Sequence, residues 1–96
     1  KPLINKYEKI GVNMNEKIWS LPLWNEYRKN MESKIADIKN SSNSPSGTIN
    51  AAIFLKDFVP PKTKWLHVDI AGVSFNKEIG ATGHSILSLY ELIKNI

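Results

Sequence analysis

The chain has 96 residues, enough for one domain, and its 42% hydrophobic and 23% charged residues are typical of a folded globular protein. It contains no cysteine, which excludes disulfides, thiolate metal sites and a cysteine nucleophile. No apolar run approaches the ~20 residues that a membrane-spanning helix requires.

The net charge is +4, and much of the basic excess lies in the first third of the chain. There the lysines alternate with glutamates, so no stripe of a single sign forms, and a solvated face of mixed charge is favoured over a nucleic-acid surface. We therefore expect neither a nucleic acid nor a membrane as partner, and a small basic nucleic-acid binder stays as an alternative. No signal peptide is visible. Because the first residue, Lys1, is not Met, we expect the chain to be processed or to be part of a longer polypeptide.

Hydrophobic periodicity predicts two helices in the first third of the chain. The first begins at Pro2 and stops at Gly11, and the second begins near Pro22. Ile35 and Ile38 indicate a further short buried segment. The inward faces of the two helices are expected to be Leu3, Ile4, Tyr7 and Ile10, then Leu23, Trp24, Tyr27 and Met31. The core is also expected to hold the tryptophans, Trp19, Trp24 and Trp65.

Two further helices are predicted after a loop. The serine- and asparagine-rich composition of residues 40–47 indicates the loop. A helix over residues 48–58 follows and is ended by two prolines, and a last helix covers residues 85–93. Their packed sides are expected to be Ile49, Ala52, Ile53 and Phe58, then Ile86, Leu89, Tyr90 and Ile93.

Residues 65–70 are the best strand candidate, because apolar Leu66, Val68 and Ile70 alternate with other residues. Small residues then turn the chain, and residues 80–83 form a second, glycine-bounded turn. A single strand cannot satisfy its own backbone donors and acceptors. Either the loops supply more strands, or the partners lie on sequence outside this chain.

Two histidine-containing pairs are candidates for chemistry, and neither completes a site. His67 and Asp69 share one face of the predicted strand, but a metal site needs a third and a fourth ligand. The favoured alternative is a structural pair that bonds neighbouring backbone or caps a turn. His84 lies beside Ser85 without a glycine-flanked nucleophile elbow, and Thr82 or Ser85 is expected to cap the last helix.

The glycine turn at residues 80–83 precedes a helix, where exposed amides can bind an anion, but it lacks the Lys-Ser/Thr of a phosphate-binding loop. A plain turn is therefore favoured. From its residues alone, the sequence predicts a mostly helical domain with one buried strand and no complete active site.

Several stretches resemble, in order, the C-terminal third of the leucyl (cytosol) aminopeptidase family. Two of them are Glu-Lys-Ile-Trp-Ser-Leu-Pro-Leu-Trp-Asn-Glu-Tyr at residues 16–27 and Trp-Leu-His-Val-Asp-Ile-Ala-Gly at residues 65–72. The other stretches are residues 34–40, residues 47–59, residues 80–83 and the closing helix. Their order and spacing carry a resemblance that covers nearly the whole chain.

The resemblance implies an α/β fold in which helices pack on part of a mixed sheet. Residues 1–96 would be the C-terminal portion of a catalytic domain built as an α/β/α sandwich. It implies a cytoplasmic, homohexameric parent enzyme that removes N-terminal residues from peptides with two divalent cations, zinc or manganese. The family's metal-binding motif, Asn-Thr-Asp-Ala-Glu-Gly-Arg, is absent from this sequence. The metal ligands are therefore expected outside this chain, which alone should be inactive.

Substrate-binding residues follow from the resemblance position by position. Ala71 matches the alanine that lines the pocket for the first side chain of the substrate, and Ser74 matches a residue facing the same pocket. Ser41 matches a position that lines the pocket for the second residue. No catalytic and no metal-binding residue is carried over. The alternative is a non-catalytic module that kept this piece of the fold and binds another protein.

Overall fold

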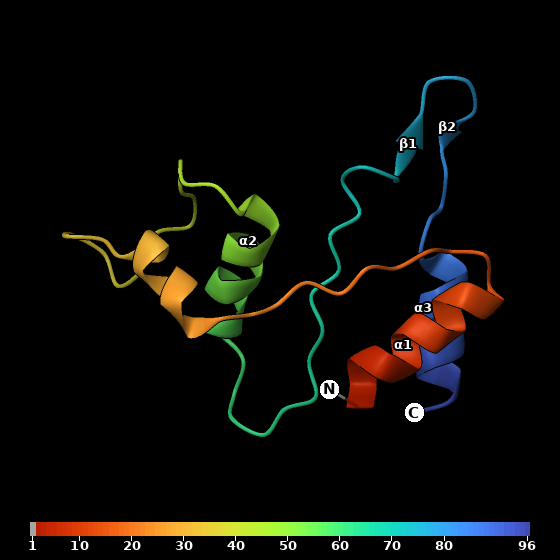
Figure 1. The fold of residues 1–96 in the computed structure, drawn as a ribbon, viewed down its shortest axis with the longest axis horizontal. Coiled ribbons are helices and arrows are strands. Elements are labelled where there is room, and N and C mark those ends of the chain that lie inside the picture. The colour runs from red at the N-terminus through yellow and green to blue at the C-terminus, as the bar shows by residue number, and fades with distance from the viewer. Residues whose placement is uncertain (1) are drawn as a thin grey trace. The chain divides into compact units, whose positions relative to one another are not determined.

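The computed structural model describes residues 2–96, and they form two compact units (Figure 1). One unit combines the residues up to Ser20 with Leu66–Ile96, and the other is Leu21–Trp65. Among the described residues, no helix has the length and apolar character needed to cross a membrane.

The first unit is built on two packed helices, α1 (Pro2–Asn13) and α3 (Ile86–Lys94), which lie side by side in Figure 1. Each helix buries a narrow stripe that faces the other. The buried residues are Tyr7 and Gly11 of α1 and Ser88 and Leu92 of α3. Because only one side of α3 is covered by α1, most of the apolar surface of α3 stays exposed.

The helix α1 begins at Pro2 as predicted but continues past Gly11, so the prediction of a stop at this glycine was wrong. Gly11 instead lets the chain fold back on the helix. The Glu16 N–H donates to the Gly11 carbonyl at 2.8 Å, and a Cβ on Gly11 would lie 2.6 Å from the Glu16 carbonyl oxygen. The glycine is needed here for close approach and not for a helix end.

The first unit also contains an antiparallel hairpin of β1 (Phe75–Asn76) and β2 (Gly80–Ala81). Phe75 pairs with Ala81 and Asn76 with Gly80. The Asn76 side-chain oxygen accepts the Glu78 N–H at 2.8 Å, and Gly80 has φ +82°, a left-handed conformation that glycine adopts without strain. The three-residue loop between the strands is thus closed by the Asn76 side chain at its start and by the left-handed Gly80 at its end.

The second unit packs a 3₁₀ helix, η1 (Asn25–Met31), against α2 (Gly47–Lys56). Met31, Ile49 and Ile53 form its buried cluster, as predicted for all three. The partly buried residues around this cluster are Leu23, Tyr27, Ile38 and Phe54. The loop predicted over residues 40–47 is confirmed up to Ser46, since α2 begins at Gly47.

The strand predicted over residues 65–70 was wrong, because this segment has no regular secondary structure. A strand needs a neighbour to accept and donate its backbone hydrogen bonds, and the sheet of residues 2–96 consists of β1 and β2 alone. The α/β class is nevertheless confirmed by helices combined with a small antiparallel sheet.

Several residues expected inside are exposed. On α3, the predicted stripe faces outward, with Ile86, Tyr90 and Ile93 all more than half exposed. Trp19 is 87% exposed and Ile35 is 98% exposed. Trp24 and Phe58 are also exposed, and each contacts another aromatic ring, Tyr27 and Phe54 respectively. The inward orientation predicted for these side chains was therefore wrong within residues 2–96, and α3 instead buries Ser88 and Leu92.

Candidate functional site

The turn that the resemblance links to substrate binding is shaped by a carboxylate and a carbonyl. The Asp69 carboxylate accepts the Ala71 N–H at 3.0 Å. The Ile70 carbonyl accepts the Val73 and Ser74 N–H groups at 3.1 and 2.9 Å. Asp69 therefore caps a turn, which is the structural alternative to a metal ligand, and the turn presents Ala71 exposed and Ser74 half-buried.

Thr82 ties this turn to the chain that returns from the hairpin. Its N–H donates to the Ser74 carbonyl at 2.9 Å, and its hydroxyl donates to the Val73 carbonyl at 2.6 Å. The same hydroxyl accepts the His84 N–H at 3.2 Å. Thr82 thus holds the turn and the start of α3 together, and it is not the helix cap that the sequence suggested.

The cap of α3 comes from Glu16, at the other end of the sequence. Its carboxylate accepts the Ser85 N–H at 2.8 Å and the Ser88 N–H and hydroxyl at 2.9 and 2.5 Å. Ser85 occupies the N-cap position, but its side chain makes no cap hydrogen bond. Sequence reasoning missed Glu16 because its partners lie about 70 positions away, and no local pattern marks it.

The electrostatics of Glu16 follow from this environment. Burial of the carboxylate would raise its pKa, but hydrogen bonds from the Ser88 hydroxyl and from the Ser88 and Ser85 amides favour the charged form. The charge of His84 acts in the same direction, and the pKa of Glu16 lies below its ordinary value. Glu16 is therefore an ionised structural anchor at neutral pH.

His84 and Ser85 do not form a nucleophilic site. The Ser85 hydroxyl lies 3.1 Å from His84 Nδ1, but Ser85 is only 3% exposed. The Ser85 and Ser88 amides at the start of α3 are bonded to Glu16, so they are not offered to an anion. The turn predicted over residues 80–83 was wrong in part, because Gly80 and Ala81 form β2, although Gly80 and Gly83 both have positive φ.

Ser41 lies in the second unit, on the exposed surface of the loop before α2. Asn50, buried in α2, holds this loop by donating to the Ser44 hydroxyl at 3.0 Å and to the Pro45 carbonyl at 3.1 Å. The structure brings Ala71 and Ser74 together in one turn, whereas Ser41 belongs to the other unit.

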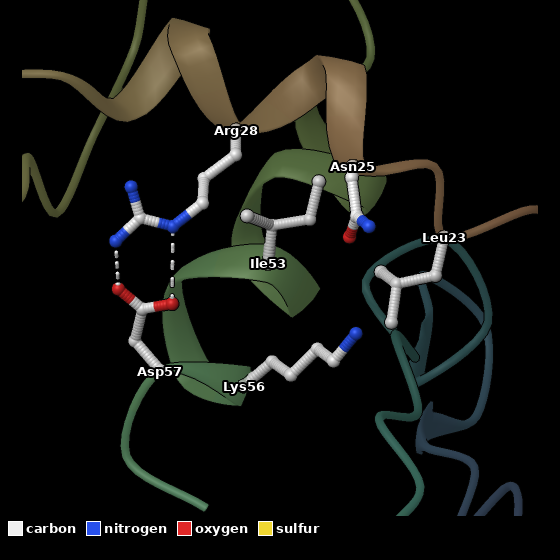
Figure 2. Close-up of a pocket in the computed structure, with 6 residues that line it drawn as sticks. All are labelled: Leu23, Asn25, Arg28, Ile53, Lys56 and Asp57. Carbon is white, nitrogen blue, oxygen red and sulfur yellow. Dashed lines mark hydrogen bonds and ion pairs between the residues drawn. The ribbon is translucent and has the colours of Figure 1, made fainter.

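A cavity of about 260 Å³ lies within the second unit (Figure 2). Arg28 and Asp57 face each other at its edge and form a bidentate ion pair. Arg28 Nε donates to Asp57 Oδ1 at 3.3 Å, and Arg28 Nη2 donates to Asp57 Oδ2 at 2.5 Å. The hydrogen bonds to Asp57 and the negative charge of Asp57 raise the pKa of Arg28, which stays fully charged. The lining is Leu23, Asn25, Arg28, Ile53, Lys56 and Asp57, and it contains none of the predicted site residues.

No group of three or more His, Cys, Asp or Glu side chains within residues 2–96 is placed to hold a metal ion. The described residues therefore do not fit a metal centre of their own.

Comparison with known proteins connects this arrangement to a family. The sequence profile of the cytosol aminopeptidase family, catalytic domain, matches residues 1–90. A probable cytosol aminopeptidase of Geobacter sp. (strain M21) is 43% identical over 96% of this chain and 20% of its own length. The corresponding protein of Phytoplasma mali (strain AT) is 46% identical over 91% of this chain and 19% of its own length.

A solved structure of a tomato leucine aminopeptidase mutant is similar in fold, with a TM-score of 0.91 and 33% identity. The match covers 99% of this chain and 19% of the tomato chain. The chain thus spans about a fifth of the length of the relatives that it matches. Since the catalytic-domain profile covers residues 1–90, the chain belongs to the cytosol aminopeptidase family.

Proposed function

We propose that this chain is the C-terminal part of the catalytic domain of a metal-dependent aminopeptidase that removes N-terminal residues from peptides. It supplies walls of the substrate pocket and not the metal ligands. The observation that carries the proposal is the match of residues 1–90 to the family's catalytic domain, together with a span of only about a fifth of its relatives.

The pocket walls are assigned to the turn after Asp69 and to the loop before α2. Ala71 and Ser74 line the pocket for the first side chain of the peptide, and Ser41 lines the pocket for the second. A methyl-sized wall at Ala71 leaves room for a leucine-sized group, whose burial contributes about 1.5–3 kcal/mol. The exposure of Ala71 on a turn fixed by hydrogen bonds supports this role.

The partner of this chain within the enzyme is the rest of the catalytic domain. The apolar face of α3 supports this, because Ile86, Tyr90 and Ile93 are exposed in the described residues. Contiguous apolar surface on a folded protein usually marks an interaction site. The family's metal-binding motif is absent from this sequence, which supports a parent enzyme whose two divalent cations, zinc or manganese, are held by residues outside this chain.

The intact protein is further proposed to be a cytoplasmic homohexamer. The name cytosol aminopeptidase, which the relatives carry, supports the compartment, and the homohexamer rests on the family resemblance alone.

The test compares the 96-residue chain with the intact gene product. The intact product, loaded with Zn²⁺ or Mn²⁺, should cleave a chromogenic leucine substrate, and a chelator should abolish this activity. The 96-residue chain should bind no stoichiometric metal and should not cleave the substrate. Activity of the 96-residue chain alone would contradict the proposal.

The same experiment distinguishes the alternatives. A folded intact product that neither binds metal nor cleaves peptides would favour a non-catalytic protein-binding module. A salt-sensitive gel shift with DNA or RNA would instead favour a nucleic-acid binder.

A further inference from the structure

We infer that Thr82 is a positioning residue for the substrate-facing turn, and that its hydroxyl sets the affinity for the first side chain of the peptide. This inference rests on the proposed function, because it assumes that Ala71 and Ser74 line that pocket.

The turn is closed locally by bonds that do not attach it to the rest of the unit. The Ala71 N–H is held by Asp69, and the Val73 and Ser74 N–H groups are held by Ile70. All three bonds join residues within four positions of each other. They fix the shape of the turn but leave its attachment to other contacts.

Thr82 provides an attachment from outside the turn. The hairpin ladder ends at the pair Phe75 and Ala81, and the bond from the Thr82 N–H to the Ser74 carbonyl extends the pairing by one residue toward the turn. The Thr82 hydroxyl then reaches one residue further and donates to the Val73 carbonyl at 2.6 Å. Two successive carbonyls of the turn are therefore held by one residue.

The hydroxyl is used as both donor and acceptor. Its single proton goes to the Val73 carbonyl, and its oxygen accepts the His84 N–H at 3.2 Å. Serine can make the same two bonds, whereas valine has nearly the shape of threonine and can make neither. His84 leads directly into the start of α3, which Glu16 caps, so Thr82 connects the turn to this capped helix end.

Without this hydroxyl, the turn keeps its local shape but can shift relative to the hairpin. Ala71 and Ser74 then no longer form a fixed wall. A wall that contacts a non-reacting side chain of the substrate acts on ground state and transition state alike, so its loss raises KM and leaves kcat nearly unchanged. One hydrogen bond corresponds to about a three- to tenfold change in affinity.

The experiment uses the metal-loaded intact gene product and the variants T82V and T82S, with T63V as matched control. Thr63 is exposed and belongs to the other unit, Leu21–Trp65. T82V should raise KM for a leucine substrate about three- to tenfold with kcat within a factor of two. T82S should restore the wild-type KM, and T63V should not change it.

A second measurement keeps the inference testable if T82V is poorly folded. T82A removes the hydroxyl without adding bulk, and hydrogen exchange of the peptide covering residues 71–76 should be faster in it than in T82S. An unchanged KM in folded T82V, or a fall in kcat with KM unchanged, would overturn the inference while the proposed function stands. An inactive wild-type product would instead overturn the proposed function.

Discussion

The Glu16 carboxylate and Ser88 are bonded to each other across 72 positions of sequence, with the Ser88 N–H at 2.9 Å and its hydroxyl at 2.5 Å. Together with the Ser85 N–H, these bonds satisfy amides that the start of a helix leaves without partners. A residue next to the end of α1 therefore fixes the start of α3, and both partners are buried.

Glu16→Gln should loosen the start of α3. The amide offers one acceptor oxygen in place of two and places an N–H₂ group against donors, which costs about 1–3 kcal/mol for a buried group. Hydrogen exchange of the peptide covering residues 84–89 in the intact gene product measures this. The exposed Glu78 on the hairpin loop provides the control, since Glu78→Gln should leave exchange in residues 84–89 unchanged.

The same bonds should make the start of α3 sensitive to acid. The pKa of Glu16 is lowered in the folded state, so its stabilising contribution is present above the ordinary value of 4.5 and is lost as the pH falls through the folded-state pKa. Exchange of residues 84–89, corrected for intrinsic rates, should rise in acid for the wild type and change much less for Glu16→Gln. If acid raised the exchange of residues 84–89 equally in the wild type and in Glu16→Gln, the role of the Glu16 carboxylate as the cap of α3 would be contradicted.

Gly11→Ala should be strongly destabilising, because the new Cβ would meet the Glu16 carbonyl oxygen at 2.6 Å, Ile18 Cγ1 at 2.9 Å and, closer still, Ile18 Cδ1. Backbone atoms cannot yield as a flexible side chain does, so we expect a loss of about 1–3 kcal/mol. Gly47→Ala is the matched control. Nothing lies within 4 Å of its Cβ position, and alanine is the better helix former by up to about 1 kcal/mol.

Denaturant unfolding of the intact gene product, followed by exchange in residues 2–13, compares the two glycine variants. If Gly11→Ala were tolerated as well as Gly47→Ala, the close packing between α1 and the chain after it would be refuted.

Met31→Ala should destabilise the second unit, whereas Ile35→Ala should not. Met31 is 1% exposed and lies in the cluster with Ile49 and Ile53, so its truncation should cost about 2–5 kcal/mol. Ile35 is 98% exposed and should change the free energy of unfolding by no more than about 0.5 kcal/mol. A large effect of Ile35→Ala in the intact protein would instead reveal that the rest of the domain covers it.

Local sequence patterns predicted the helices well, because helix formation depends on spacing within one segment. The periodicity around Tyr7 and Ile53 placed α1 and α2 within a few residues of their observed bounds. The loop before α2 was equally clear, since its composition alone opposes regular structure.

Features that depend on distant partners were missed. The alternation at Val68 is that of a strand, yet a strand without a neighbour is not formed. The outward stripe on α3, which contains Ile93, reflects the same shortage of covering surface. The cap at Glu16 had no local signal at all. In the candidate site, the sequence indicated the turn at Ala71 through resemblance, but the bond from Thr82 to Val73 depends on the fold and left no local pattern in the sequence.

The most direct test of the central claim is the substrate profile of Ala71→Phe in the metal-loaded intact gene product. A phenyl group on the pocket wall should lower kcat/KM for a leucine substrate about ten- to hundredfold and affect an alanine substrate far less, because the smaller side chain still fits. Ala36→Phe, on the exposed surface of the second unit, should affect neither substrate. An unchanged leucine-to-alanine ratio in a folded, active Ala71→Phe variant would contradict the assignment of this chain as a wall of the substrate pocket.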